Sequence, residues 1–430
     1  MYNLRGGFLV RPLVIAVVLG FAGAIFSWLE ERFPFTNHWV PAALFPSHAD
    51  PQVAQVILAG IAASMMTVVS IVFAILLMTL TLASMQFSPR IIVSFAKDRV
   101  TQWTLGIFLG TFSYCMAALP AAHALPVPFE PVATVLGAML LALTCVGWLL
   151  FFIHHISQAI SVNHIVDRIA KETEAVIDEL MPWPHQVDRL RHTETTVPFS
   201  EEITILSRES GYVRFIDTQR LVVFAKHFHV RIRVLRRVGH FVPAGIPLMM
   251  VSKGSRLPDD GEARLLAAFD FGPTRTLQQD VEFGVLQIVD IALKAISPAV
   301  NDPSTAISCV DQLSRIMIRF ASRQPPDEFL FDPPGVVRVA VGWVGFERIL
   351  EAAFEQIRMY SKTDVAVSLR VMRALRDIAT STPDPEFRRI LVERGLRTVT
   401  GCAEKLGGEE LRELRARQAM LEGLMANGQS

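Results

Sequence analysis

The sequence predicts an α-helical membrane domain with four transmembrane helices, followed by a cytoplasmic α+β region that contains a small β-barrel-like module and a helical domain. Of the 430 residues, 51% are hydrophobic and 19% are charged, whereas a soluble domain carries about 25% charged residues. The charge is also uneven, because residues 1–160 hold only six of the 41 Lys and Arg and five of the 41 Asp and Glu. This asymmetry excludes a purely soluble enzyme and a disordered chain. The formal net charge of zero gives no support for nucleic acid as a partner.

Four apolar stretches in the predicted membrane domain, residues 1–156, are long enough to cross a bilayer, which takes about 20 residues of helix. They lie at about 12–29, 53–85, 103–122 and 131–153. Lys and Arg cluster before the first stretch, between the second and third, and after the fourth. Because short cytoplasmic loops are enriched in Lys and Arg, the sequence predicts that both termini are cytoplasmic.

The predicted spans carry no Asp, Glu, Lys or Arg at their centres. This disfavours an ion-coupled transporter, since such carriers need an ionisable residue within the membrane. The second stretch has small and hydroxyl side chains at helical spacing, and its Ser64, Thr67 and Thr81 are candidates to line a pore. The same pattern is more commonly a sign of close helix packing. Gly106 and Gly110 form a GxxxG pair in the third stretch, which also predicts a close helix contact.

The first part of the charged half changes from a helical to a strand pattern. Residues 157–184 are amphipathic and predict a connecting helix that continues the fourth span, whereas residues 195–252 predict a β-rich module. The clearest strand candidates are 210–217, 221–225, 232–234 and 239–248. Residues 210–250 resemble the barrel-sandwich hybrid of biotinyl- and lipoyl-like domains. No lysine between methionines occupies a hairpin tip, so the resemblance implies a structural or docking module and no carrier chemistry.

Residues 262–430 are predicted to be mainly helical, with one strand near 336–344. Asp302 followed by Pro303 predicts a helix start, with Asp302 as N-cap and Pro303 in the first position. The candidates for a ligand or ion site where two helices meet are Arg275, Asp280, Asp290, Asn301 and Asp302. Helix capping and ion pairs within a helix are an adequate explanation on their own and the commoner one, and a ligand or ion site stays open as the alternative. The four cysteines are isolated, and no metal site is predicted.

Two stretches carry a resemblance that extends over essentially the whole chain. The first runs from Ser84 to Arg90 and is followed by Gln102 and Gly106. The second runs from Arg275 to Ala306 and includes Gln279-Asp280, Val289-Asp290 and Asn301-Asp302-Pro303. Together they resemble the bacterial "predicted membrane protein" family, a domain family of unknown function. The resemblance implies a bacterial inner-membrane protein with an N-terminal span region and a cytoplasmic C-terminal half, and it implies no activity.

The sequence contains no nucleophile–base motif, no HExxH, no phosphate-binding glycine loop and no Rossmann fingerprint. We therefore expect no enzyme activity and no cofactor. One remaining hypothesis is a homo-oligomeric ion channel or pore with a cytoplasmic regulatory domain, in which several chains surround one axis. The other is a membrane-anchored sensor or scaffold that binds a cytoplasmic protein or a small-molecule ligand without conduction. The expected partners are the lipid bilayer, further copies of the chain and, for the second hypothesis, that protein or ligand.

Overall fold

The computed structural model describes residues 10–33, 51–86, 99–121, 131–159, 161–183, 202–332 and 335–426. The chain divides into two compact units, Met1–His164 and Ile165–Ser430. The residues from Phe87 to Arg90, which carry part of the family resemblance, lie outside the described residues, as does most of the charged loop between the second and third predicted spans.

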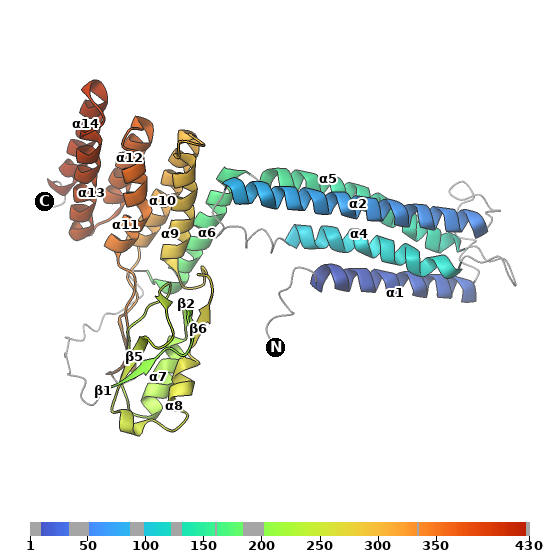
Figure 1. Ribbon diagram of the computed structural model, residues 1–430, viewed down its shortest axis with the longest axis horizontal. Coiled ribbons are helices and arrows are strands. Elements are labelled where there is room, and N and C mark those ends of the chain that lie inside the picture. The colour runs from blue at the N-terminus through green and yellow to red at the C-terminus, as the bar shows by residue number, and fades with distance from the viewer. Residues whose placement is uncertain are drawn as a thin grey trace. The chain divides into compact units, whose positions relative to one another are not determined.

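The first unit is a bundle of apolar helices: α1 (Val10–Arg32), α2 (Pro51–Gln86), α4 (Arg99–Ala118, followed by the 3-10 helix η3, Leu119–Ala121) and α5 (Val132–Ala159) (Figure 1). Three described segments are long and apolar enough to cross a membrane: Val10–Arg32, Pro51–Thr79 and Val132–Gln158. The prediction of four transmembrane helices is thus confirmed for three segments and not for α4, which coincides with the predicted span 103–122. α4 packs against α1, α2 and α5, and it buries threonine, glutamine and glycine residues there. A helix enclosed by other helices needs less apolar surface than one that faces lipid.

Glycines set the contact between α1 and α4. A Cβ atom at Gly23 of α1 would lie 2.5 Å from the carbonyl oxygen of Tyr114 in α4. Cβ atoms at Gly106 and Gly110 of α4 would collide with side chains of α1. The close contact predicted from the GxxxG pair is therefore confirmed, and α1 is the partner helix.

A buried carboxylate links the end of α1 to the start of α5. The side chain of Glu30 accepts hydrogen bonds from the backbone N–H groups of Ala133 (2.7 Å) and Thr134 (2.9 Å). It also accepts one from Thr134 Oγ1, at 2.8 Å. The first N–H groups of a helix have no partner within the helix, and a negative charge is favourable there. Glu30, which in the sequence only flanks the first span, thus caps α5.

The helix predicted over 157–184 does not continue α5. α6 (Val162–Leu180) begins after Ser161, which belongs to neither helix. The backbone N–H of Ser161 donates to the carbonyl of Gln158 at 3.1 Å, which closes a turn instead of extending the helix.

Ion pairs fix α6 to α10 (Pro303–Ala321) within the second unit. Arg315 Nε donates to Glu174 at 2.9 Å, and one turn later Arg319 Nε donates to Asp178 at 2.7 Å. Arg323, another turn along, also pairs with Asp178. Arg315 and Arg319 share one face of α10, and Arg323 follows just after the end of the helix, so α6 lies along that face.

The second unit contains two small sheets. The larger has the strand order β1 (Glu202–Leu206), β5 (Pro247–Ser252), β3 (Ile232–Val234), β8 (Val336–Val341) and β7 (Phe329–Asp332). The smaller has the order β4 (Phe241–Val242), β2 (Gly211–Ile216) and β6 (Phe269–Gly272). All pairs are antiparallel except β3–β8, where Ile232 pairs with Val339. β8 is the strand expected near 336–344, and it joins strands more than 80 residues earlier in the chain.

One segment predicted as a strand is helical. Residues 221–225 lie in α7 (Thr218–His227), which begins where the Asp217 side chain accepts a hydrogen bond from the backbone N–H of Arg220 at 2.9 Å. Leu221, Phe224 and Ala225 are the buried residues of α7, at helical spacing. The further helical elements beside the sheets are η4 (Gly254–Arg256) and α8 (Gly261–Leu266). With a helix in place of a strand, the resemblance to a barrel-sandwich hybrid is not confirmed.

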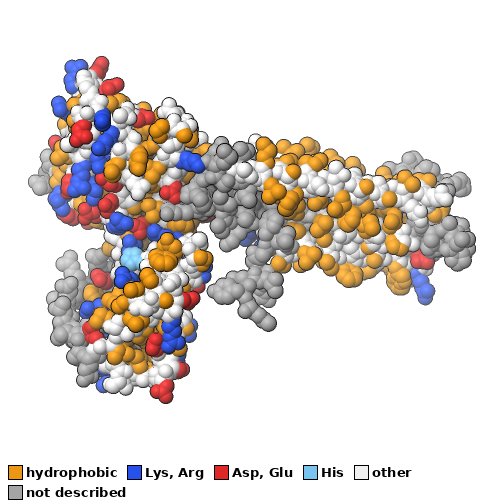
Figure 2. Space-filling view, in the orientation of Figure 1, with side chains coloured by type: hydrophobic (Ala, Val, Ile, Leu, Met, Phe, Trp, Pro, Cys, Tyr) orange, Lys and Arg blue, Asp and Glu red, His pale blue; other side chains and the backbone are white. Residues whose placement is uncertain are grey.

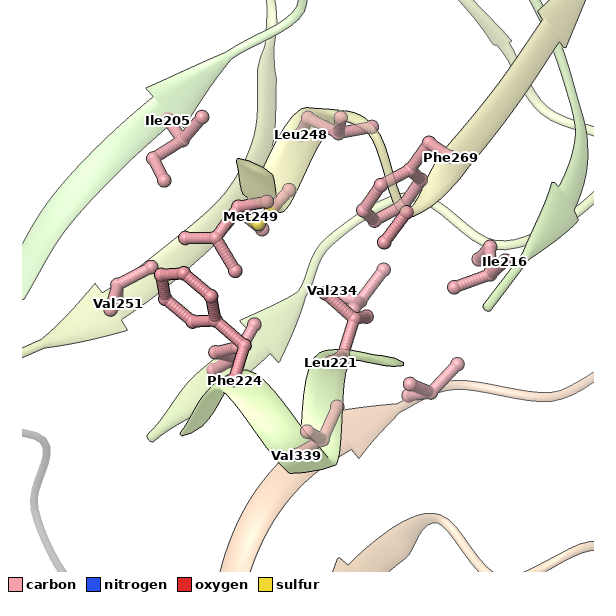
Figure 3. Close-up of a cluster of buried hydrophobic side chains, with 14 of the residues drawn as sticks. Ile205, Ile216, Leu221, Phe224, Val234, Leu248, Met249, Val251, Phe269 and Val339 are labelled. Carbon is pink, nitrogen blue, oxygen red and sulfur yellow. The ribbon is translucent and has the colours of Figure 1, made fainter. Parts of the chain in front are cut away.

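The core of the sheet part lies between α7 and the strands. Figure 3 shows Leu221 and Phe224 of α7 among side chains of the larger sheet, including Met249 of β5 and Val339 of β8. Each of these four residues is less than 9% exposed. Burial of one such side chain contributes roughly 1.5–3 kcal/mol, so this cluster holds α7 against the sheet.

The remaining helices of the second unit pack side by side (Figure 1). They are α9 (Val281–Ala295), α10, α11 (Phe346–Tyr360), α12 (Val365–Ser381), α13 (Pro385–Ala403) and α14 (Gly408–Ala426). Aspartates form the N-caps of α9, α10, α12 and α13, where each side chain accepts a backbone N–H: Asp280, Asp302, Asp364 and Asp384. The predicted arrangement of Asp302 as N-cap and Pro303 in the first position is confirmed.

Candidate functional site

A pocket of about 340 Å³ opens in the second unit between the turn that joins β3 to β4 and the helices α9 and α11. Its polar wall is formed by Arg236, Arg237, His240, Arg275, Glu282 and Arg348. Figure 2 shows basic side chains and a histidine gathered in the notch between the sheet part and the helical part of this unit.

Backbone hydrogen bonds to β2 hold the turn that carries Arg236 and Arg237. Gly239 donates its N–H to the carbonyl of Val213 at 2.8 Å, and Val213 donates to the carbonyl of His240 at 2.9 Å. Gly239 has φ +87°, a conformation that side chains with a Cβ atom rarely adopt. A Cβ here would lie 2.6 Å from Asp280 Oδ2, so glycine is required for the turn to approach α9.

Asp280 orients the arginine at the base of the pocket. Its Oδ1 accepts the backbone N–H of Phe283 at 3.0 Å and so caps α9. Both carboxylate oxygens accept hydrogen bonds from Arg275, at 2.7 Å from Nε and 2.8 Å from Nη2. Burial alone would lower the pKa of Arg275, but the hydrogen bonds and charge of Asp280, with those of Glu282, raise it above its ordinary value. Arg275 is therefore a permanently charged and fixed group.

Glu282 is the centre of the cluster and its side chain is only 5% exposed. It contacts Arg237 (3.1 Å), Arg275 (3.2 Å) and Arg348 (2.9 Å). Burial works to raise the pKa of Glu282, but the charges of the three arginines outweigh it and hold the pKa below its ordinary value. Glu282 is thus ionised, and it joins the sheet turn, the start of α9 and the start of α11.

The pocket has an excess of positive charge. Four arginines, Arg236, Arg237, Arg275 and Arg348, meet three carboxylates, Asp280, Glu282 and Glu351, which leaves one positive charge uncompensated at this wall. Among the described residues Arg236 has no carboxylate within ion-pair distance, and its guanidinium donates only a long hydrogen bond, 3.4 Å, to a backbone carbonyl. Arg348 remains 57% exposed. Arginine binds planar anions through two parallel hydrogen bonds, so the wall is suited to an anion.

His240 adds a titratable group to the same wall. Burial lowers its pKa below the ordinary value, and the charges of Arg237 and Arg236 lower it further, against the opposing charge of Glu282. His240 is therefore neutral at neutral pH. A bound anion would favour the protonated form.

The structure separates the five residues predicted as a ligand or ion site. Arg275 and Asp280 lie at the pocket, and Asp290 lies half-buried along α9. Asn301 and Asp302 follow the far end of α9, roughly 20 Å away at 1.5 Å per residue of helix. Asp302 Oδ1 accepts the N–H of Thr305 at 3.1 Å and Oδ2 accepts the Thr305 hydroxyl at 2.6 Å. These hydrogen bonds lower the pKa of Asp302 and account for it as a cap.

We expect Asp302→Ala to lower the free energy of unfolding by about 1 kcal/mol, the usual contribution of an N-cap. The difference between variant and wild type should be the same with and without added cations or nucleotides. A difference in melting temperature that changes with the concentration of such a ligand would show that Asp302 binds it.

The three predicted pore residues lie on the exposed face of α2. Ser64, Thr67 and Thr81 each donate a hydroxyl hydrogen bond to a carbonyl of their own helix, at 2.8, 3.2 and 2.8 Å. Within the part of the chain that the structure describes, all three side chains are exposed.

Sequence analysis missed Arg236, Arg237, His240, Glu282 and Arg348. Two features of the sequence could have indicated a buried charged site. One is an acidic residue on the apolar face of a helix, as at Glu282, and the other is the arginine pair Arg236-Arg237 shortly before Gly239. No signal in a single sequence connects Arg348 to them. Among the described residues, no group of three or more His, Cys, Asp or Glu is placed to hold a metal ion.

The helix bundle with three candidate spans, joined in one chain to a charged α/β unit, defines a membrane protein with a large extramembrane part. The chain belongs to the family described as "Predicted membrane protein (DUF2254)", whose model matches residues 5–377. It is similar to "Uncharacterized protein MT1328" of Mycobacterium tuberculosis and to "Uncharacterized protein Mb1321c" of Mycobacterium bovis, with 31% identity over 414 residues in each case. The matches cover 95% of this chain and 78% of each relative. No solved structure matches the chain.

Proposed function

We propose that this membrane protein is an anchored receptor whose second unit binds a small organic anion in the arginine pocket. The observation that carries the proposal is the pocket wall, in which four arginines meet three carboxylates and Arg236 has no carboxylate partner among the described residues. A partly buried arginine without a carboxylate partner costs free energy, which a bound anion would offset. The proposed activity is binding, with neither catalysis nor conduction, and it corresponds to the sensor hypothesis.

Ligand-induced stabilisation tests this proposal. With the full chain in detergent or nanodiscs, ribose 5-phosphate at 100 times its Kd should stabilise the second unit by about 2.7 kcal/mol. Arg236→Gln should abolish most of this gain, because Arg236 is the arginine without a carboxylate partner. Its melting temperature without ligand should stay near that of the wild type, since the residue makes only one long hydrogen bond.

Arg208→Gln is the matched control. Arg208 is 63% exposed, pairs with Glu262 and lies outside the pocket, so this variant should respond to ligand as the wild type does. The proposal fails if no organic anion stabilises the wild type, or if Arg236→Gln and Arg208→Gln respond alike.

We also propose that the protein lies in a bacterial inner membrane, with both termini and the pocket in the cytoplasm. The support is the distribution of Lys and Arg in short loops. Reporter fusions after Lys97 and at Ser430 should read as cytoplasmic, and a fusion after Ala122 should read as external. A cytoplasmic reading after Ala122 would mean that α4 does not cross the membrane. An external reading at Ser430 would overturn the proposed orientation.

A second candidate function is a pore formed by several copies of the chain. It is favoured by the exposed hydroxyl groups of Ser64, Thr67 and Thr81 on α2. Small and polar residues on an outward helix face suit either a contact between copies or a water-filled channel.

Thr67→Lys discriminates a water-filled channel from a lipid-facing surface. A lysine at the centre of a span costs at least ~2.5–3.5 kcal/mol on insertion scales, unless water solvates it. If α2 lines a pore, the variant should insert and shift the reversal potential in planar bilayers toward anion selectivity. No conductance from folded wild-type protein across voltage and tension would count against the pore. Conductance with an unchanged reversal potential would remove Thr67 from the channel wall.

A further inference from the structure

The pocket is larger than a single inorganic ion requires. Its volume of about 340 Å³ lies at the lower end of the range of about 300–1,000 Å³ that is typical of pockets for small organic ligands. Leu286, one turn after Glu282 on α9, adds an apolar side chain to the lining. A ligand that fills the pocket therefore has a part that is not charged.

An aromatic ring stands beside the arginines. Phe241 of β4 lines the pocket and is 53% exposed. Its cross-strand neighbour Tyr212 packs against it edge-on, with ring centroids 5.2 Å apart and an interplanar angle of 69°. This contact fixes the ring of Phe241 while leaving much of it uncovered. An exposed, oriented aromatic ring is a surface on which a flat ligand ring can stack.

We propose that the anion is an aromatic phosphate monoester of about the size of a nucleoside monophosphate, with its phosphate on Arg236 and Arg348 and its ring on Phe241. This inference rests on the proposed function and specifies its ligand. A phosphate monoester carries a charge of about −1.5 to −2 at pH 7 and three acceptor oxygens, so one phosphate group can accept hydrogen bonds both from Arg236, which has no carboxylate partner among the described residues, and from Arg348, which is 57% exposed. Arginine also forms paired hydrogen bonds to phosphate.

The ring and the phosphate make separable contributions to affinity. Stacking of a base on an aromatic side chain strengthens binding by roughly 5- to 150-fold. The wild type should thus bind AMP at least about fivefold more tightly than ribose 5-phosphate, which has the same phosphate without the base. Adenosine, which has the base without the phosphate, should bind more weakly than either.

Isothermal titration calorimetry on the full chain in nanodiscs, with AMP, ribose 5-phosphate and adenosine, measures these differences. Phe241→Ala should reduce the affinity for AMP to that for ribose 5-phosphate, and it should leave the affinity for ribose 5-phosphate unchanged, which also reports that the pocket is folded. Phe241→Tyr should retain the preference for AMP. Phe329→Ala removes a 41% exposed phenylalanine of β7 outside the pocket and should change neither affinity.

Each contrary result has a distinct meaning. Equal affinities for AMP and ribose 5-phosphate, both lost in Arg236→Gln, would overturn the aromatic ligand and leave the anion receptor intact. A preference for AMP that survives Phe241→Ala would overturn the role of Phe241. Binding of adenosine as tight as that of AMP would overturn the phosphate ligand. Absence of binding by all three compounds would also overturn it, and stabilisation of the wild type by a carboxylate such as citrate would then decide whether the proposed function survives.

Discussion

Glu282→Gln should lower the free energy of unfolding of the second unit by about 3 kcal/mol, because removing one partner of a buried ion-pair cluster leaves the other charges uncompensated. The variant leaves Arg237, Arg275 and Arg348 without their shared carboxylate. For a unit of this size the loss corresponds to a decrease in melting temperature of about 6–12 °C. Differential scanning fluorimetry of the full chain without ligand measures it.

The pH dependence of this effect has a definite sign. The arginines hold the pKa of Glu282 below its ordinary value of 4.5. The ionised side chain therefore makes its full contribution to the free energy of unfolding above pH 4.5. The contribution is lost as the pH falls through the lowered pKa. The difference between wild type and Glu282→Gln should therefore shrink in acid.

Glu351→Gln is the control for Glu282→Gln. Glu351 pairs with the same Arg348, at 3.3 Å, but is 43% exposed. Its loss should change stability by no more than about 0.5 kcal/mol, as at ordinary surface sites. Equal effects of the two substitutions would contradict the description of Glu282 as the centre of the cluster.

Gly23→Val should separate α1 from α4 and cost about 1–3 kcal/mol, the usual range for overpacking. The added Cβ would lie 2.5 Å from the carbonyl oxygen of Tyr114, and a backbone atom cannot rotate away as a side chain can. Cys115, which follows Tyr114 in α4, is fully buried in the bundle. Its rate of labelling by a maleimide, read by mass spectrometry, should rise in the variant.

Gly60→Val provides the matched control within the same bundle. A Cβ at Gly60 of α2 would meet nothing within 4 Å, so a single chain tolerates valine there. Labelling of Cys115 should stay at the wild-type rate. Unchanged labelling in Gly23→Val, or equally fast labelling in both variants, would contradict the glycine contact between α1 and α4.

Local features of the fold could be predicted from the sequence because neighbouring residues determine them. The N-cap at Asp302, the valine-rich strand β8 and the apolar helices each depend on a run of a few residues. The sequence predicts a strand at the position of α7 because Leu221-Val-Val-Phe-Ala225 is rich in the residues that strands favour. The N-cap at Asp217 and the helical spacing of the buried residues Leu221, Phe224 and Ala225 favour the helix that the structure has there.

The pocket could be predicted only in part because it is assembled from distant segments. Arg275 and Asp280 were found, since they lie five residues apart at a helix start. Glu282 and Arg348 are 66 residues apart, and only the packing of α11 beside α9 brings them together. The separation of Asn301 and Asp302 from Asp280 depends on the length of α9, which runs without a break from Val281 to Ala295.

The central claim is that the arginine pocket of the second unit binds an organic anion. A cryo-electron microscopy structure of the full chain in nanodiscs with saturating AMP tests it most directly. We expect ligand density in the pocket, with the phosphate within hydrogen-bond distance of Arg236 and Arg348. An empty pocket at a concentration that stabilises the protein, or density at another site alone, would contradict the claim.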